Sequence, residues 1–120
     1  MSGHNVAIEL SQAEFELADP GNAGSIPSPN INGGVLPLVT AAAETRALEN
    51  PERAGIVMTL CFRTDGGDCV VTAASAVNQA GNNTLTLADA GDEITLRSIR
   101  SGDTFVWRVA SNDGVALSTV

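Results

Sequence analysis

Turn-forming segments recur about every ten residues from residue 35 to the last residue, and this spacing constrains the fold more than any other feature. Apolar and polar side chains alternate along the short segments between the turns, as in strands with one buried face. Such regular spacing is typical of antiparallel sandwiches and small barrels. We therefore predict an all-β domain over residues 35–120, a small antiparallel β-sandwich or barrel. The turns are expected at residues 50–55, 65–66, 80–83, 88–92, 101–103 and 112–114.

Two of the predicted strands show the alternation most clearly. Residues 56–63 carry only apolar side chains at even-numbered positions, which share one face of a strand. Residues 104–110 place Phe105, Trp107 and Val109 on one face, and we expect these three in the core of the last sheet or at a contact between subunits. The other predicted strands are 35–40, 44–48, 69–73, 84–87, 93–100 and 115–120. Pro37 indicates that the first of these lies at a sheet edge. For the second, a short helix over 41–48 is the alternative.

Residues 1–34 differ in composition from the rest of the chain. The stretch 21–34 is rich in Gly, Pro, Asn and Ser and does not form a core of its own. Short strand patterns occur at 6–10 and 14–17, although a helix over 11–18 is an alternative for the second. We interpret residues 1–34 as an extended N-terminal arm that orders against another surface; a partly disordered terminus is the other interpretation. The apolar residues expected to make the contact are Val6, Ile8, Leu10, Phe15 and Leu17.

The apolar side chains are mostly aliphatic, because aromatic residues make up only 3% of the chain. A core of this kind forms thin layers and gains little from large rings. All six basic residues are Arg, the cation preferred where a forked hydrogen bond is needed in an interface. We therefore expect neighbouring subunits to supply part of the burial.

The net charge of −8 argues against two classes of partner. Nucleic-acid binding needs a basic surface, and an anionic membrane surface also attracts basic segments. The sequence contains no apolar run of about 18 residues and does not begin with the basic and apolar pattern of a signal peptide. We expect neither nucleic acid nor membrane as a partner, and synthesis in a cytoplasm.

Cys61 and Cys69 lie on either side of an expected turn. Asp65-Gly66 is a strong signal for a two-residue hairpin, and in that register Cys61 faces Val70 while the two sulfurs point to opposite faces. A three-residue loop would instead bring the two cysteines together. The hairpin register and a reducing compartment favour free thiols over a disulfide.

Residues with catalytic or ligand-binding chemistry are sparse. His4 is the only histidine, and it lies in a polar terminal segment. Most carboxylates beyond residue 60 fall at or beside turns, where Asp bonds to nearby backbone N–H groups. The stretch 89–93 offers three carboxylates, but their spacing does not match a calcium loop. Gly33-Gly34 precedes a strand and does not begin a helix, unlike a phosphate-binding loop. We expect no enzymatic activity, no metal and no cofactor.

The C-terminal two thirds of the chain resemble a known group of proteins. The resemblance is carried by the segments 81–87 (GNNTLTL), 90–92 (AGD), Leu96, 107–109 (WRV) and 112–118 (NDGVALS). These segments resemble small structural proteins from the head and fibre modules of tailed bacteriophages, notably capsid decoration (cement) proteins and head-fibre proteins. They are strand and turn segments and do not form a catalytic signature.

The resemblance implies a function without catalysis. Such a protein is part of the virion at the capsid surface, where a homotrimer stabilises the shell by clamping neighbouring major capsid subunits. The N-terminal arm would then bind the capsid, and the major capsid protein and other copies of the chain would be the partners. The alternative is a phage fibre or tail-associated module that binds a receptor or a glycan.

Overall fold

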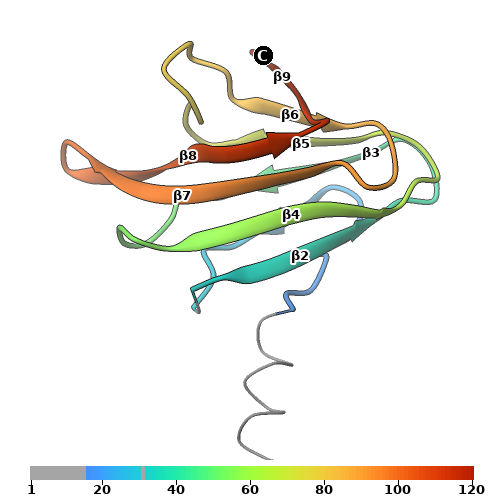
Figure 1. The fold of residues 1–120 in the computed structure, drawn as a ribbon, viewed down its shortest axis with the longest axis horizontal. Coiled ribbons are helices and arrows are strands. Elements are labelled where there is room, and N and C mark those ends of the chain that lie inside the picture. The colour runs from blue at the N-terminus through green and yellow to red at the C-terminus, as the bar shows by residue number, and fades with distance from the viewer. Residues whose placement is uncertain (1–15, 31) are drawn as a thin grey trace, which may run out of the picture.

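The computed structural model describes residues 16–30 and 32–120, which form a sandwich of two β-sheets (Figure 1). This confirms the predicted all-β class. No helix in the described part of the chain is long and apolar enough to cross a membrane. The strands are β1 (Gly24–Ile26), β2 (Gly34–Val39), β3 (Glu44–Leu48), β4 (Val57–Thr64), β5 (Cys69–Ala73), β6 (Thr84–Leu87), β7 (Glu93–Ser101), β8 (Thr104–Asp113) and β9 (Ala116–Ser118).

Both sheets are mixed and not purely antiparallel as expected. One sheet has the order β1-β3-β5-β6-β9 and the other β2-β4-β7-β8. The pairs β1/β3, β3/β5 and β2/β4 are parallel, and the remaining pairs are antiparallel. The cause is the path of the chain, because β1 to β5 alternate between the two sheets. Successive strands in one sheet therefore run in the same direction.

The segment around Asp65-Gly66 is an arch between the sheets and not the predicted hairpin. It joins β4 in the four-stranded sheet to β5 in the five-stranded sheet. A Cβ atom on Gly66 would collide with the backbone of Thr40 and Ala41, and one on Gly67 with the backbone of Ala42. Glycine is thus needed here because two loops pack closely together, and the expected opposition of Cys61 and Val70 does not occur.

The β7–β8 hairpin agrees with the predicted turn at residues 101–103. Ser101 pairs with Thr104 across it, and Gly102 has a φ of 62°, in the left-handed region that favours glycine. In the same hairpin Trp107 pairs with Ser98 and Val109 with Leu96, whose side chains are both buried. Trp107 and Val109 of the predicted inward face therefore face the other sheet, whereas Phe105 pairs with the exposed Arg100.

The core lies between the two sheets and is mainly aliphatic. Trp107 is its largest member, 1% exposed, and its indole N–H donates to the carbonyl oxygen of Glu49 at 2.9 Å. Phe105 and Val109 are half-buried, and Val109 packs against the core. The indole thus fills the interior while its one polar atom is satisfied.

The described part of the predicted arm belongs to the sandwich, so the boundary expected near residue 35 differs from the structure. β1 pairs with Arg46 to Leu48 of β3, and Ile26 is 2% exposed in the core. Glu16 forms a parallel bridge with Val35, so residues 16–18 do not continue the alternative helix. The short β1 is stable because it extends an existing sheet. The composition of residues 21–34 does not show that this pairing occurs.

Candidate functional site

The N-terminal segment is joined to the sandwich along the free edge of β2. The Leu17 N–H donates to the Val35 carbonyl at 2.7 Å, and the Val39 N–H donates to the Asp19 carboxylate at 3.0 Å. Pro37, between these two points, has no N–H to offer. Residues 16–19 thus cover the edge of β2.

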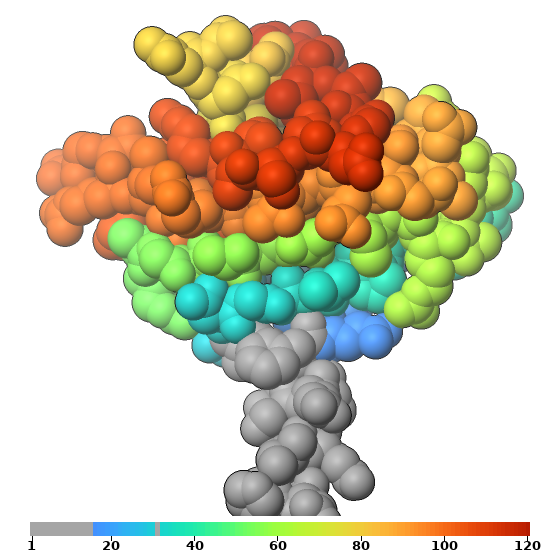
Figure 2. Space-filling model, viewed as in Figure 1, coloured from blue at the N-terminus to red at the C-terminus, as the bar shows by residue number. Residues whose placement is uncertain are grey.

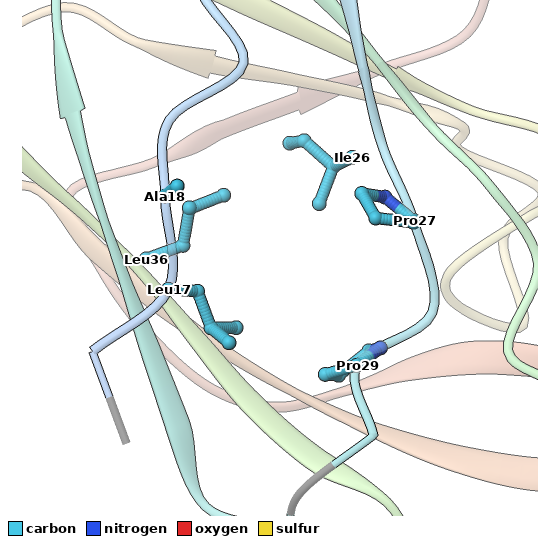
Figure 3. Close-up of a pocket in the computed structure, with 6 residues that line it drawn as sticks. All are labelled: Leu17, Ala18, Ile26, Pro27, Pro29 and Leu36. Carbon is cyan, nitrogen blue, oxygen red and sulfur yellow. The ribbon is translucent and has the colours of Figure 1, made fainter. Parts of the chain in front are cut away.

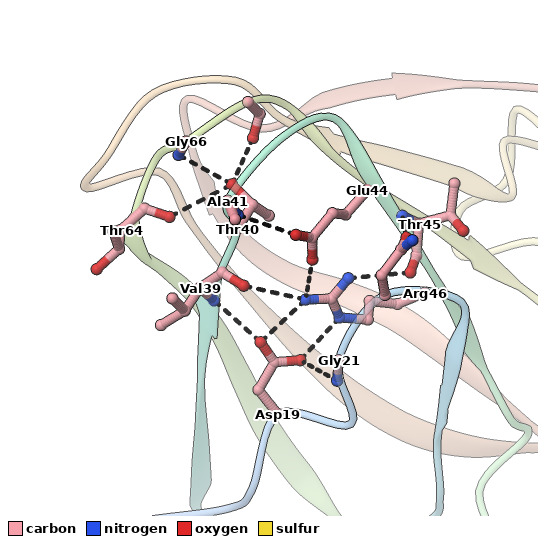
Figure 4. Close-up of polar contacts among 12 residues, drawn as sticks. Asp19, Gly21, Val39, Thr40, Ala41, Glu44, Thr45, Arg46, Thr64 and Gly66 are labelled. Carbon is pink, nitrogen blue, oxygen red and sulfur yellow. Dashed lines mark hydrogen bonds and ion pairs between the residues drawn. The ribbon is translucent and has the colours of Figure 1, made fainter.

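Arg46 of β3 holds this segment through a buried ion pair (Figure 4). Its Nε donates to one oxygen of Asp19 at 2.7 Å and its Nη2 to the other at 3.0 Å. The same guanidinium donates to Glu44 at 3.0 Å and to the carbonyl oxygens of Thr45 and Val39. The side chain of Arg46 is fully buried. We call Asp19, Glu44 and Arg46 the anchor.

The anchor is fully charged under ordinary conditions. Burial alone would raise the pKa of Asp19, but hydrogen bonds from Arg46 and from the N–H groups of Val39 and Gly21 outweigh it and lower that pKa. The pKa of Glu44 is lowered chiefly by the N–H of Ala41, and also by Arg46. The pKa of Arg46 is raised by its hydrogen bond to Asp19. The guanidinium is therefore held between two carboxylates.

Sequence reasoning missed the anchor, although one signal was available. Residues 44–48 were predicted as a strand, and in a strand Arg46 shares a face with Leu48. A charged residue on the same face as a core leucine must find a partner, because an unpaired buried charge is costly. The partner Asp19 is 27 residues away, and no local pattern identifies it.

An apolar pocket lies beside the anchor, with a cavity of about 170 Å³ (Figure 3). Leu17 forms part of its wall and is half-buried against the core. A Cβ atom on Gly34 would lie 2.9 Å from Leu17 Cδ1, so glycine allows this leucine to sit close to β2. The lining residues are Leu17, Ala18, Ile26, Pro27, Pro29 and Leu36.

Only Leu17 of the predicted arm contacts lies in the described part of the chain. Val6, Ile8, Leu10 and Phe15 are outside the described residues, and so is His4. The predicted core or subunit contact is separate from the anchor: Trp107 and Val109 belong to or pack against the core, whereas Phe105 is half-buried with the Arg100 guanidinium 5.9 Å from its ring.

Both thiols are free, as predicted, although for a different reason. Cys61 is half-buried in β4 and Cys69 is buried in β5, so the two residues are in different sheets. Burial raises the pKa of each thiol, which keeps both in the protonated, less reactive form.

Within residues 16–30 and 32–120, no three His, Cys, Asp or Glu side chains are grouped to hold a metal ion. Comparison with models of known protein families gives no match, and comparison with curated proteins gives none either. The anchor holds residues 16–19 against the sandwich, and its polar groups are already paired with one another and with the backbone.

Proposed function

We propose that the protein is a structural component of a tailed-bacteriophage virion and has no catalytic role. As a homotrimer it decorates the capsid and stabilises it by clamping neighbouring major capsid subunits. The resemblance of residues 81–118 to decoration and head-fibre proteins supports the phage context. The anchor supports the mode of attachment.

The observation that carries the proposal is the fixed root of the N-terminal segment. A segment that clamps a partner transmits force to its own domain, so it must be joined firmly at its base. Here the base is held by two strands at once, since Asp19 bonds to β2 through Val39 and to β3 through Arg46. Removing one partner from a buried pair costs about 3–5 kcal/mol, so the root is a strong attachment.

Residues 1–15 would then make the contact with the capsid. Val6, Ile8 and Leu10 alternate with Ala7 and Glu9, a pattern that suits addition of a strand to an open sheet edge on a partner. A segment that orders on binding loses conformational entropy but can extend across more than one subunit.

The test compares the full chain with a variant that carries Val6→Asp, Ile8→Asp and Leu10→Asp. Co-sedimentation with capsids of the encoding phage, prepared without this protein, measures binding. We expect the triple variant to lose binding while its thermal unfolding midpoint stays unchanged, because the core of the sandwich described here is built from residues after 16. Val120→Asp, which changes an 85% exposed valine, is the control and should bind normally.

Two results would contradict the proposal. Normal capsid binding by the triple variant would place the attachment in the sandwich itself. No binding by the unaltered chain, combined with specific binding to a glycan array, would favour a receptor-binding module of a fibre.

A further inference from the structure

The outer face of the four-stranded sheet carries two rows of like charge. Arg97 of β7 is the cross-strand partner of Arg108 of β8, and we call this pair the basic row. Glu93 is the partner of Asp113 at the other end of the same two strands, and this pair is the acidic row. All four side chains share the outer face, since the residues that alternate with them along β7 point into the core.

Neither row has its counter-charge within the described residues. The three ion pairs there use only Arg46 and Arg63, and Arg63 is bonded to Glu16 at 2.7 Å. Arg108 donates to the carbonyl oxygens of Ala76 and Trp107, and neither is charged. Like charges directly opposite each other in a sheet are destabilising. The fold therefore tolerates two repulsive pairs that a complementary surface would relieve.

The surface between the rows suits a close contact. Thr95 and Ser111, which are also cross-strand partners, lie between them, and the Thr95 hydroxyl is 2.9 Å from that of Thr59 on β4. Arg97 lies four positions after Glu93 along β7, which is about 13 Å in an extended strand. In Figure 2 the orange and red atoms of β7 and β8 form a continuous band on the viewed side.

We propose that this face binds a second copy of the chain, with the basic row of one copy against the acidic row of the next. The same face of another copy carries the matching acidic pair, Glu93 and Asp113. A guanidinium and a carboxylate form paired hydrogen bonds, so each contact gives a charged row the counter-charge that it lacks within one copy.

This contact gives the proposed homotrimer a specific interface. It depends on the proposed function only for the number of copies. Both rows lie on one face, so a two-fold axis pairs them in both directions within a dimer, whereas a ring forms when each row meets a different neighbour. The proposed homotrimer corresponds to the ring. The capsid plays no part in this contact, so failure of capsid binding leaves it standing.

The experiment reverses the charges on the full chain and measures its mass in solution by light scattering after size-exclusion chromatography. Arg97→Glu with Arg108→Glu should weaken self-association about tenfold or more, because acidic rows then face each other. Adding Glu93→Arg and Asp113→Arg to the same chain restores complementarity, and association should return. The control, Arg53→Glu with Arg100→Glu, changes the net charge by the same amount at other exposed arginines and should leave association unchanged.

Four results would contradict the proposed contact between copies. Association of the double variant at the unaltered strength, a monomeric unaltered chain, or no recovery in the folded four-residue variant overturns the proposal. Association that is unchanged between about 0.05 M and about 0.5 M salt also overturns it, because exposed ion pairs are screened over this range. A salt-sensitive dimer that responds to the substitutions as predicted supports the contact and overturns the homotrimer.

Discussion

At the scale of single residues, the account depends on one buried guanidinium. Arg46 uses its donors on two carboxylates and two carbonyl oxygens, which come from three separate parts of the chain. A buried charge pair does not need to stabilise a fold more than an apolar pair would, but breaking it leaves an unpaired charge. The main effect of the Arg46–Asp19 pair is to fix the position of Asp19 against β2 and β3.

Replacing Arg46 by Ala should lower the free energy of unfolding by about 3–5 kcal/mol. The substitution leaves Asp19 and Glu44 facing each other without their shared cation. Urea denaturation of the full chain measures the loss. Arg53→Ala is the matched control, since Arg53 is exposed and should cost within about 0.5 kcal/mol. Equal losses for the two variants would show that the anchor does not hold the segment.

Acid should weaken the anchor. The pKa values of Asp19 and Glu44 are lowered in the folded chain, so their contribution is present above the unfolded values, near pH 4, and is lost as the pH falls through the folded values. The free energy of unfolding should therefore fall as the pH drops below about 4. Asp19→Asn combined with Glu44→Gln should flatten this dependence. A double variant that follows the unaltered chain across the acid range would contradict the assignment.

Trp107→Ala should cost about 3–5 kcal/mol, because a large core side chain is replaced by a cavity. Trp107→Phe should cost less, since it keeps a ring but removes the indole donor to Glu49. Urea denaturation of both variants gives the losses, and the fluorescence of the unaltered chain should show a buried indole. A loss near zero for the alanine variant would place Trp107 outside the core.

At the scale of the elements, alternation in the sequence predicted where the strands after residue 34 lie, but it did not predict β1. The predicted strands 56–63 and 104–110 correspond to β4 and β8, and Trp107 faces inward as expected. The partner of each strand was not predictable in this way, because a period of two defines a face and not a neighbour. Asp65-Gly66 was misread as a hairpin, since a glycine needed for close packing looks the same in sequence as one needed for a turn.

Gly66→Ala tests the arch directly. Its new Cβ atom would meet the backbone of Thr40 and Ala41, so one of the two loops must shift. We expect a loss of about 1–3 kcal/mol in the free energy of unfolding, as for other substitutions that overpack a closely fitted site. Asp65→Ala in the same loop is exposed and should be nearly neutral. An unchanged stability of the glycine variant would mean that the two loops do not pack closely.

At the scale of the whole molecule, a thin aliphatic sandwich carries a firmly rooted N-terminal segment and a face with two unpaired charge rows. The low aromatic content predicted a modest core, and the core holds two aromatic rings, Phe62 and Trp107, among aliphatic side chains. The anchor and the charge rows were beyond reach of the sequence, because each depends on residues brought together by pairing between strands. Together they describe a module suited to an assembly.

A cryo-EM reconstruction of the capsid proposed to carry this protein is the decisive test of the proposed function. We expect three copies of the sandwich around a local symmetry axis, with residues 1–15 of each copy lying on neighbouring major capsid subunits. The anchor should remain intact at the base of each segment. A capsid on which the sandwich binds through its own sheets, with residues 1–15 making no contact with the shell, would contradict the account.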